Sequence, residues 1–340
     1  MGTTASDMGI VTTPQLHWMV HAKNKGIEAT ELNYYYPLEN AQGDNTLNVS
    51  DKLVVDGADG VGGEKAENLK TRLGYLIIDV RNCGSGVLNG VGADYVQKEK
   101  MAPRNFGPAD AGMRCANLDG DADRLVVYFY VILSNSNKID LVDGDKILPL
   151  LALFLKEQLC ILKDGKTYNF YKSSLGVEQT AYANGASTDY LKQMGLEVVM
   201  TPTGVQYLQR KSCRELSSTS KGEVSSSFVT FYAVTNFLLI NNFLHSLGLD
   251  ILLIKNFLLF ALRLLAVSRL INQAVGDALS GLFLVEAILK HMGWSIHKWN
   301  ELYQDLPSRQ LKVKVVDRTA VITEKAEMKV VSPAGHTRSY

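Results

Sequence analysis

The chain has 340 residues, which is long enough for two or three domains that each bury a core of their own. Lys plus Arg and Asp plus Glu both number 35, so the formal net charge is zero and the composition argues against nucleic-acid binding. A small molecule or a protein is the expected partner.

The cysteines and the N-terminus indicate the compartment. The four cysteines are widely spaced and form no Cys-x-x-Cys pair, which disfavours both a zinc site and a disulfide framework. The first twenty residues lack the basic start and the continuous apolar stretch of a signal peptide. These features predict a cytoplasmic protein with reduced thiols.

The first half of the chain reads as strands that alternate with Gly-rich turns and helices. From Lys52 an apolar strand leads through a run of glycines into a helix that ends near Gly74, and the next strand follows directly. Residues 93–98 and 114–118 resemble further short strands, and residues 124–133 are rich in β-branched and aromatic residues, as in a buried strand.

The second half continues the alternation. Residues 142–159 predict a helix with Asp143 or Asp145 as its N-cap. We further expect a helix over 177–195, a strand over 196–201, a turn leading to another helix, an amphipathic helix over 268–293 and a strand over 309–317. Strands that alternate with helices predict an α/β fold with layered mixed sheets.

One region breaks this pattern. A Ser/Thr-rich stretch from Arg214 gives way to an apolar segment, residues 228–267, and no charged residue occurs between Val224 and Leu249. The segment is long enough to cross a bilayer, but three asparagines and His245 interrupt it, and each is costly in hydrocarbon. A buried hairpin, or a segment foreign to the ancestral fold, is therefore favoured over a membrane span.

The run "NLDGDADRLVVYF", residues 117–129, carries the strongest chemical signal. Asp119, Asp121 and Asp123 alternate, so on an extended segment they would point to one side and repel one another unless a cation lies among them. Hard oxygen ligands suit Mg²⁺. The alternative is a solvated turn in which one Asp caps the end of a strand.

Two other interpretations of the glycine- and aspartate-rich runs fail. An EF-hand loop from Asp119 would place Arg124 where Gly is needed and Tyr130 where Glu is needed. A phosphate-binding P-loop would require Lys where Gly63 stands. Because Mg²⁺ commonly shares a phosphate ligand, and Arg124 can hold phosphate with two donors, phosphoryl transfer is the expected chemistry.

Several motifs in order carry a resemblance. The Asp run resembles the metal loop of the α-D-phosphohexomutases. Together with five further runs it is similar to the phosphoacetylglucosamine mutase branch of that family, over most of residues 7–213 and 264–335: "TTPQLHWMV", "NGASTDYL", "TPTGV", "INQAVGDALSGL" and "DLPSRQLKVKVVDR".

This resemblance implies an activity and a set of site residues. Members of the family interconvert N-acetylglucosamine 6-phosphate and 1-phosphate through a phosphoserine and a bisphosphate intermediate, on the route to UDP-N-acetylglucosamine. By the same resemblance Asp119, Asp121 and Asp123 bind Mg²⁺, and Arg124 faces the phosphoryl group as the catalytic candidate. The substrate is a sugar phosphate, and the sequence leaves the oligomeric state open.

The run "TPTGVQYL", residues 201–208, is similar to a family loop near the active cleft. Thr203, Gly204 and Gln206 are therefore substrate-adjacent candidates, although relatives carry Lys where this chain has Gln206. The alternative is a simple strand-to-helix turn with Thr203 as the N-cap.

Three family loops do not occur in the 340 residues: the Thr-Ala-Ser-His-Asn-Pro serine loop, the Glu-Ala-Asn-Gly-His-Gly sugar loop and the Arg-Pro-Ser-Gly-Thr phosphate loop. The resemblance thus implies a form truncated at both ends and impaired or inactive as a mutase; a non-catalytic protein that binds Mg²⁺ or a sugar phosphate is the alternative. The expected parts are a remnant of a first domain (1–45), a second domain with the metal loop (46–163), a third domain interrupted at about 214–264 (164–305) and the start of a fourth (306–340).

Overall fold

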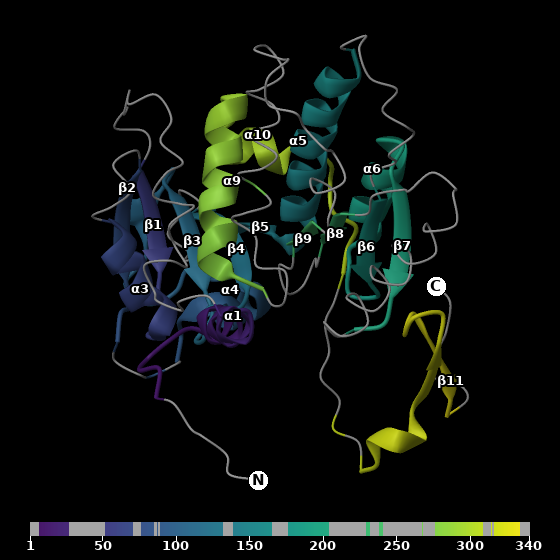
Figure 1. Cartoon of the computed structure of the whole chain (residues 1–340), viewed down its shortest axis with the longest axis horizontal. Coiled ribbons are helices and arrows are strands. Elements are labelled where there is room, and N and C mark those ends of the chain that lie inside the picture. Colours follow the sequence, from purple (N-terminus) through teal and green to yellow (C-terminus); the bar gives the residue numbers. More distant parts are fainter. Residues whose placement is uncertain are drawn as a thin grey trace. The chain divides into compact units, whose positions relative to one another are not determined.

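The computed structural model describes residues 7–26, 52–70, 76–84, 87, 89–131, 139–164, 176–203, 229–231, 238–240, 267, 276–308, 314 and 316–333. The chain divides into two compact units, Met1–Asp143 with Arg269–Glu286 and Gly144–Ser268 with Ala287–Tyr340 (Figure 1). The four-domain division expected from the sequence stays a prediction.

The first unit is built on a mixed sheet in the order β2-β1-β3-β4-β5 (Figure 1). β2, β1 and β3 are parallel, whereas β3, β4 and β5 are antiparallel. The strands are β1 (Lys52–Asp56), β2 (Ile77–Arg81), β3 (Arg114–Leu118), β4 (Leu125–Val131) and β5 (Ile139–Asp143). The expected α/β class with mixed sheets is confirmed, and the strands expected around residues 52, 75, 114 and 124 are present.

Among the described residues of this unit, four α-helices accompany the sheet: α1 (Thr13–Asn24), α3 (Val61–Lys70), α4 (Gly92–Glu99) and the part of α9 (Ala278–Met292) up to Glu286. α4 packs against β3 and β4. Their shared core is apolar and contains Val54, Ala93, Val96, Ala102, Phe106, Cys115 and Ile139. The helix expected over 268–293 is present over Ala278–Met292, where Asp277 accepts the amides of Leu279 and Ser280, and residues 268–275 lie outside the described residues.

The strand expected at residues 93–98 is wrong, because these residues form α4. Ala93 and Val96 are buried three residues apart, while Asp94 and Lys98 form an exposed pair four residues apart. Both spacings belong to a helix rather than to a strand. In so short a segment, the spacing of apolar residues does not distinguish the helical period of about 3.6 residues from the strand period of about 2.

The turn between β1 and α3 needs its glycines because backbone approaches backbone there. A Cβ on Gly57 would lie 2.6 Å from the Cα of Gly63, and a Cβ on Gly60 would collide with the backbone of Gly120. The Gly-rich turn therefore packs directly against the loop from Asp119 to Arg124, called the Asp loop below.

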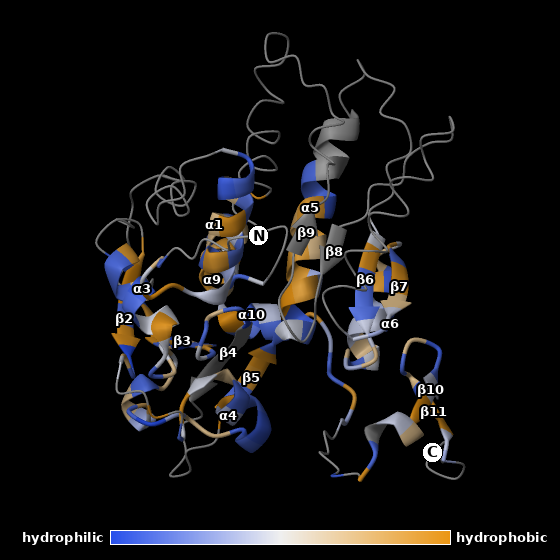
Figure 2. Ribbon diagram, turned by 60° about the horizontal axis from the view of Figure 1, so that its bottom comes forward, coloured by the Kyte–Doolittle hydropathy of each residue, from blue (hydrophilic) through white to orange (hydrophobic). Residues whose placement is uncertain are grey.

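The second unit contains the long helix α5 (Gly144–Asp164), whose coloured part in Figure 2 is mostly hydrophobic. It also contains the parallel pair β6 (Gly176–Thr180) and β7 (Glu197–Thr201), with α6 (Gly185–Gln193) between them in the chain. α10 (Ile296–Asn300) packs against α5. Of the two N-cap candidates, Asp143 is the residue directly before α5. The helix expected over 177–195 is wrong in its first part: Gly176–Thr180 is a fully buried strand, and the helix begins after Asn184, whose side chain accepts the amide of Ala186.

Two short antiparallel pairs complete the described residues. β8 (Val229–Phe231) pairs with β9 (Leu238–Ile240), and β10 (Ile322–Glu324) pairs with β11 (Lys329–Ser332). The described positions of the strand expected over 309–317, residues 314, 316 and 317, are not in a strand. Most of the apolar segment 228–267 lies outside the described residues, and no helix within those residues is long and apolar enough to cross a membrane.

Candidate metal centre

Asp119 to Arg124 form the loop that joins β3 to the antiparallel β4. The loop turns sharply: the amide of Ala122 donates to the carbonyl of Asp119 (3.3 Å), and Ala122 has a left-handed φ of 57°. As a result, one carboxylate oxygen from each of Asp119, Asp121 and Asp123 lies within 4.8 Å of the others.

The three carboxylates do lie together, but the reason expected from the sequence is wrong. On an extended segment Asp119 and Asp123 would be about 13 Å apart, too far to share one ion. The left-handed turn at Ala122 shortens that separation and gathers the three side chains.

The loop is held by the first residues of three helices from distant parts of the chain. Three consecutive loop carbonyls each accept one helix-start amide: Val61 of α3 donates to Gly120 (3.0 Å), Thr13 of α1 to Asp121 (3.1 Å) and Ala278 of α9 to Ala122 (3.0 Å). The first amides of a helix lack partners within the helix, and its N-terminus carries a partial positive charge. The three helices thus fix the backbone of the loop and place their partly positive ends at its carbonyls.

The carboxylates differ in burial. Asp119 is 4% exposed, Asp123 is half-buried and Asp121 is exposed. Burial, followed by the charge of Asp123, raises the pKa of Asp119 to about 7, although Arg124 acts in the opposite direction. Burial and the nearby Asp121 likewise raise the pKa of Asp123, against hydrogen bonds with Asp119 and Arg124 that lower it. Burial and the repulsion between carboxylates therefore both disfavour the charged forms of Asp119 and Asp123.

Arg124 contributes the positive charge within the loop. Its Nε lies 2.7 Å from Asp119 Oδ2 and 3.5 Å from Asp123 Oδ1, and its Nη1 donates to Asp94 Oδ1 of α4 (3.2 Å). One guanidinium therefore faces three carboxylates, two from the loop and one from α4.

This donor set fits a hard divalent cation. Mg²⁺ and Ca²⁺ prefer carboxylate oxygens as ligands, and three such oxygens lie close together here. One of them belongs to Asp119, a buried group whose pKa is raised by burial and by Asp123. A bound cation would offset both the burial and the repulsion that raise the pKa values of Asp119 and Asp123. Among the residues that the structure describes, no other group of acidic, His or Cys side chains is arranged to hold a metal.

The other predicted site residues belong elsewhere. Thr203 follows β7 in the second unit, where its amide donates to Glu327 (2.9 Å). Gly204 and Gln206 lie outside the described residues. The sequence reasoning missed Thr13 and Asp94, although the Thr-x-x-Gln pattern at Thr12 could have indicated the start of α1.

Comparison with solved structures identifies the class. A crystal structure of N-acetylglucosamine-phosphate mutase, described as a member of the α-D-phosphohexomutase superfamily in its substrate complex, covers 97% of this chain with a TM-score of 0.81 and 30% identity. Aspergillus fumigatus N-acetylphosphoglucosamine mutase, in complex with GlcNAc-6P and magnesium, covers 97% with a TM-score of 0.76 and 34% identity. Over 97% of its length, the chain is homologous to the first of these proteins, a member of the α-D-phosphohexomutase superfamily.

Sequence comparison narrows the branch to the phosphoacetylglucosamine mutases. The chain is 52% identical to the Arabidopsis thaliana phosphoacetylglucosamine mutase and 36% identical to the human one, in each case over 98% of its own length. Residues 143–216 and 257–294 match the family model described as Phosphoacetylglucosamine mutase AMG1, domain III. The chain spans 62% of the Arabidopsis protein, 61% of the human protein, and 61% and 66% of the two solved chains.

Proposed function

We propose that this chain is a phosphoacetylglucosamine mutase-like protein whose Mg²⁺ ligands are Asp119, Asp121 and Asp123, and that this form is impaired in turnover. The reaction is the interconversion of N-acetylglucosamine 6-phosphate and N-acetylglucosamine 1-phosphate, through a phosphoserine and a bisphosphate, for UDP-N-acetylglucosamine biosynthesis in the cytoplasm. The observation that carries the proposal is the cluster of three carboxylate oxygens within 4.8 Å of one another.

The chain's own residues have separate tasks in this proposal. When bound, Mg²⁺ supplies positive charge that offsets the charge of a phosphoryl group. Asp119, buried and bonded to Arg124, gives the site a fixed ligand, whereas Asp121 and Asp123 supply the more accessible ones. The bonds from Arg124 to Asp119 and Asp94 use Nε and Nη1 of a side chain that has five N–H donors, so the guanidinium can contact a phosphoryl group without leaving its partners.

The relatives support the choice of substrate and ion. The Aspergillus fumigatus structure is described as a complex with GlcNAc-6P and magnesium, and a second structure of that protein as a complex with glucose 1,6-bisphosphate. The identities of 34% in both comparisons make transfer of the ligands to this chain a reasonable proposal.

Calorimetric titration of the 340-residue chain with Mg²⁺ tests the metal site. We expect saturable binding to one site, and at least a roughly 100-fold weaker affinity in Asp121→Ala because a ligand is lost. Asp189→Ala removes an exposed carboxylate from α6 and should bind as the wild type does. A wild-type chain that binds no Mg²⁺, or an Asp121→Ala variant that binds equally well, contradicts the proposal.

A second measurement separates the mutase from a non-catalytic binding protein. The alternative to a mutase with impaired turnover is a non-catalytic protein that binds Mg²⁺ or a sugar phosphate. Phosphorus NMR with N-acetylglucosamine 6-phosphate and a trace of sugar bisphosphate follows turnover. Turnover near the rate of a full-length relative refutes impairment, whereas metal binding without turnover or phosphoenzyme supports the binding alternative.

A further inference from the structure

At the start of α1, one backbone N–H takes no part in the hydrogen bonds that cap the helix. Gln15 donates its amide to the Thr12 hydroxyl (3.3 Å), and Leu16 donates to the Thr12 carbonyl (3.0 Å). Pro14 has no N–H. The amide of Thr13 is therefore the remaining donor of the first turn, and it binds the carbonyl of Asp121 (3.1 Å).

Thr13 binds Asp121 a second time through its side chain. Its Oγ1 donates to Asp121 Oδ2 (2.8 Å), so one residue fixes both the backbone and the carboxylate of Asp121. The hydrogen bond from Thr13 Oγ1 orients Asp121, whereas Asp119 needs no such partner. Asp119 is buried and receives the Arg124 guanidinium, whereas Asp121 is exposed and its carboxylate would otherwise rotate in solvent.

We propose that Thr13 is a positioning residue of the metal site: its hydroxyl holds the Asp121 carboxylate in the orientation that places it beside those of Asp119 and Asp123. The inference rests on the proposed Mg²⁺ site. Partners that orient a ligating carboxylate from outside contribute to metal affinity because they remove the cost of ordering the ligand when the ion binds.

The chain allows the side-chain bond to be removed alone. Thr13→Val keeps the backbone N–H, and with it the bond to the Asp121 carbonyl, and it keeps the β-branched shape. Thr13→Ala removes the hydroxyl in a smaller side chain, and Thr13→Ser retains the hydroxyl. Thr319 offers a matched control, because its hydroxyl donates to an exposed aspartate, Asp317 (2.6 Å), in the other unit.

The test is the Mg²⁺ dissociation constant of the 340-residue chain, measured by calorimetry together with the melting temperature of each metal-free variant. We expect Thr13→Val and Thr13→Ala to bind Mg²⁺ about 10-fold more weakly, and Thr13→Ser and Thr319→Val to stay within about twofold of the wild type. Melting temperatures should match across the Thr13 series.

The outcomes separate the two proposals. If the wild type binds Mg²⁺ and the two hydroxyl-free variants bind as tightly, the role of Thr13 is refuted and the metal site stands. If Thr13→Ser is as weak as Thr13→Val, or if affinity falls only in step with melting temperature, the hydroxyl is not the determinant and the inference also fails. Absence of wild-type binding overturns the metal site and the inference together.

Discussion

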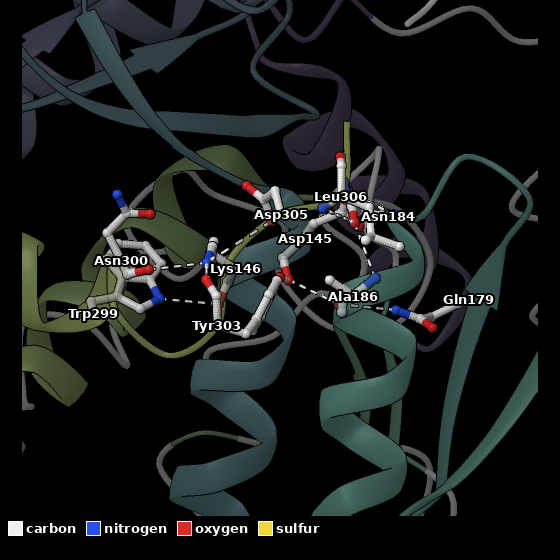
Figure 3. Close-up of polar contacts among 11 residues, drawn as sticks. Asp145, Lys146, Gln179, Asn184, Ala186, Trp299, Asn300, Tyr303, Asp305 and Leu306 are labelled. Carbon is white, nitrogen blue, oxygen red and sulfur yellow. Dashed lines mark hydrogen bonds and ion pairs between the residues drawn. The ribbon is translucent and has the colours of Figure 1, made fainter. Parts of the chain in front are cut away.

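The two units each contain a polar cluster, and the clusters differ in how well their charges are matched. In the first unit, one guanidinium meets the carboxylates of the Asp loop. In the second unit, Lys146 at the start of α5 is 1% exposed; its Nζ donates to the carbonyls of Asn300 (3.0 Å) and Tyr303, lies 3.6 Å from the centre of the Tyr303 ring and is 3.9 Å from Asp305 (Figure 3). In this group of Lys146, Asn300, Tyr303 and Asp305, called the Lys146 cluster below, acceptors surround a single cation.

This difference separates a stabilising cluster from a binding site. A buried charge whose donors all meet acceptors ties segments together, and its loss leaves buried groups unpaired. Carboxylates that outnumber their cation remain short of positive charge, which a bound ion can supply. Charge changes should therefore affect folding in the Lys146 cluster and metal binding in the Asp loop.

Replacement of Lys146 should have the largest effect on stability. Lys146→Met keeps the length of the side chain but leaves the carbonyls of Asn300 and Tyr303 without their donor, so we expect the free energy of unfolding to fall by about 3 kcal/mol. Urea denaturation followed by circular dichroism measures the change.

Lys298→Met is the matched control for that variant. Lys298 lies on α10, is exposed, and has its ammonium 3.8 Å from a carboxylate oxygen of the exposed Glu301. Exposed pairs contribute little, so a loss of about 0.5 kcal/mol or less is expected. Equal losses in the two variants would show that the Lys146 contacts add nothing beyond those of a surface lysine.

The Asp loop should make the stability of the metal-free protein depend on pH. Because the pKa of Asp119 is raised to about 7 by burial and by Asp123, the folded state takes up a proton as the pH falls through 7. The unfolded state stays ionised down to about pH 4, so the folded state binds more protons in this window and the free energy of unfolding rises as the pH falls.

Between pH 8 and pH 6 this gain amounts to about 1.4 kcal/mol for a group with that pKa. Urea denaturation of the wild type and of Asp119→Asn at both pH values measures it, since the variant lacks the titrating group. Saturating Mg²⁺ should abolish the gain by keeping Asp119 ionised. A wild type and a variant with the same pH dependence would contradict this prediction.

The composition of the Asp loop could be predicted from the sequence, but its geometry could not. Three aspartates and one arginine in six residues indicate a cation site by charge alone. Their proximity depends on the left-handed turn at Ala122, a residue that carries no sequence signal for such a conformation. The partners Thr13 and Asp94 lie 108 and 30 residues from the loop residues that they contact, and local pattern does not report contacts at such separations.

The secondary structure was predictable where length and composition agreed, as in β1, α3 and α5. The prediction failed at Ala93 to Lys98, a segment too short for its apolar residues to distinguish the period of a helix from that of a strand. It also failed at Gly176 to Thr180, where a strand rich in polar residues is buried; Gln179 binds Ser187 and Thr188 of α6 there. Burial of polar side chains depends on partners from other segments, so hydropathy alone misreads such a strand.

The smallest expected effect concerns Asn184, on the edge of the Lys146 cluster. Its Oδ1 caps α6 by accepting the amide of Ala186 (3.0 Å) and also accepts the amide of Leu306 (3.1 Å), while its Nδ2 donates to the Leu306 carbonyl (2.9 Å) (Figure 3). Asn184→Ala removes the cap and should lower the free energy of unfolding by about 1 kcal/mol.

Asn184→Ser separates the two contributions, because serine can cap the helix but is too short to replace the amide donor to Leu306. Recovery of most of the loss in the serine variant would assign the stabilisation to the cap. If serine is no better than alanine, the stabilisation comes from the link between α6 and Leu306. Both variants should bind Mg²⁺ like the wild type, because the Lys146 cluster has its charges matched within the protein and supplies no ligand to the Asp loop; weaker Mg²⁺ binding in either would contradict the distinction between the two clusters.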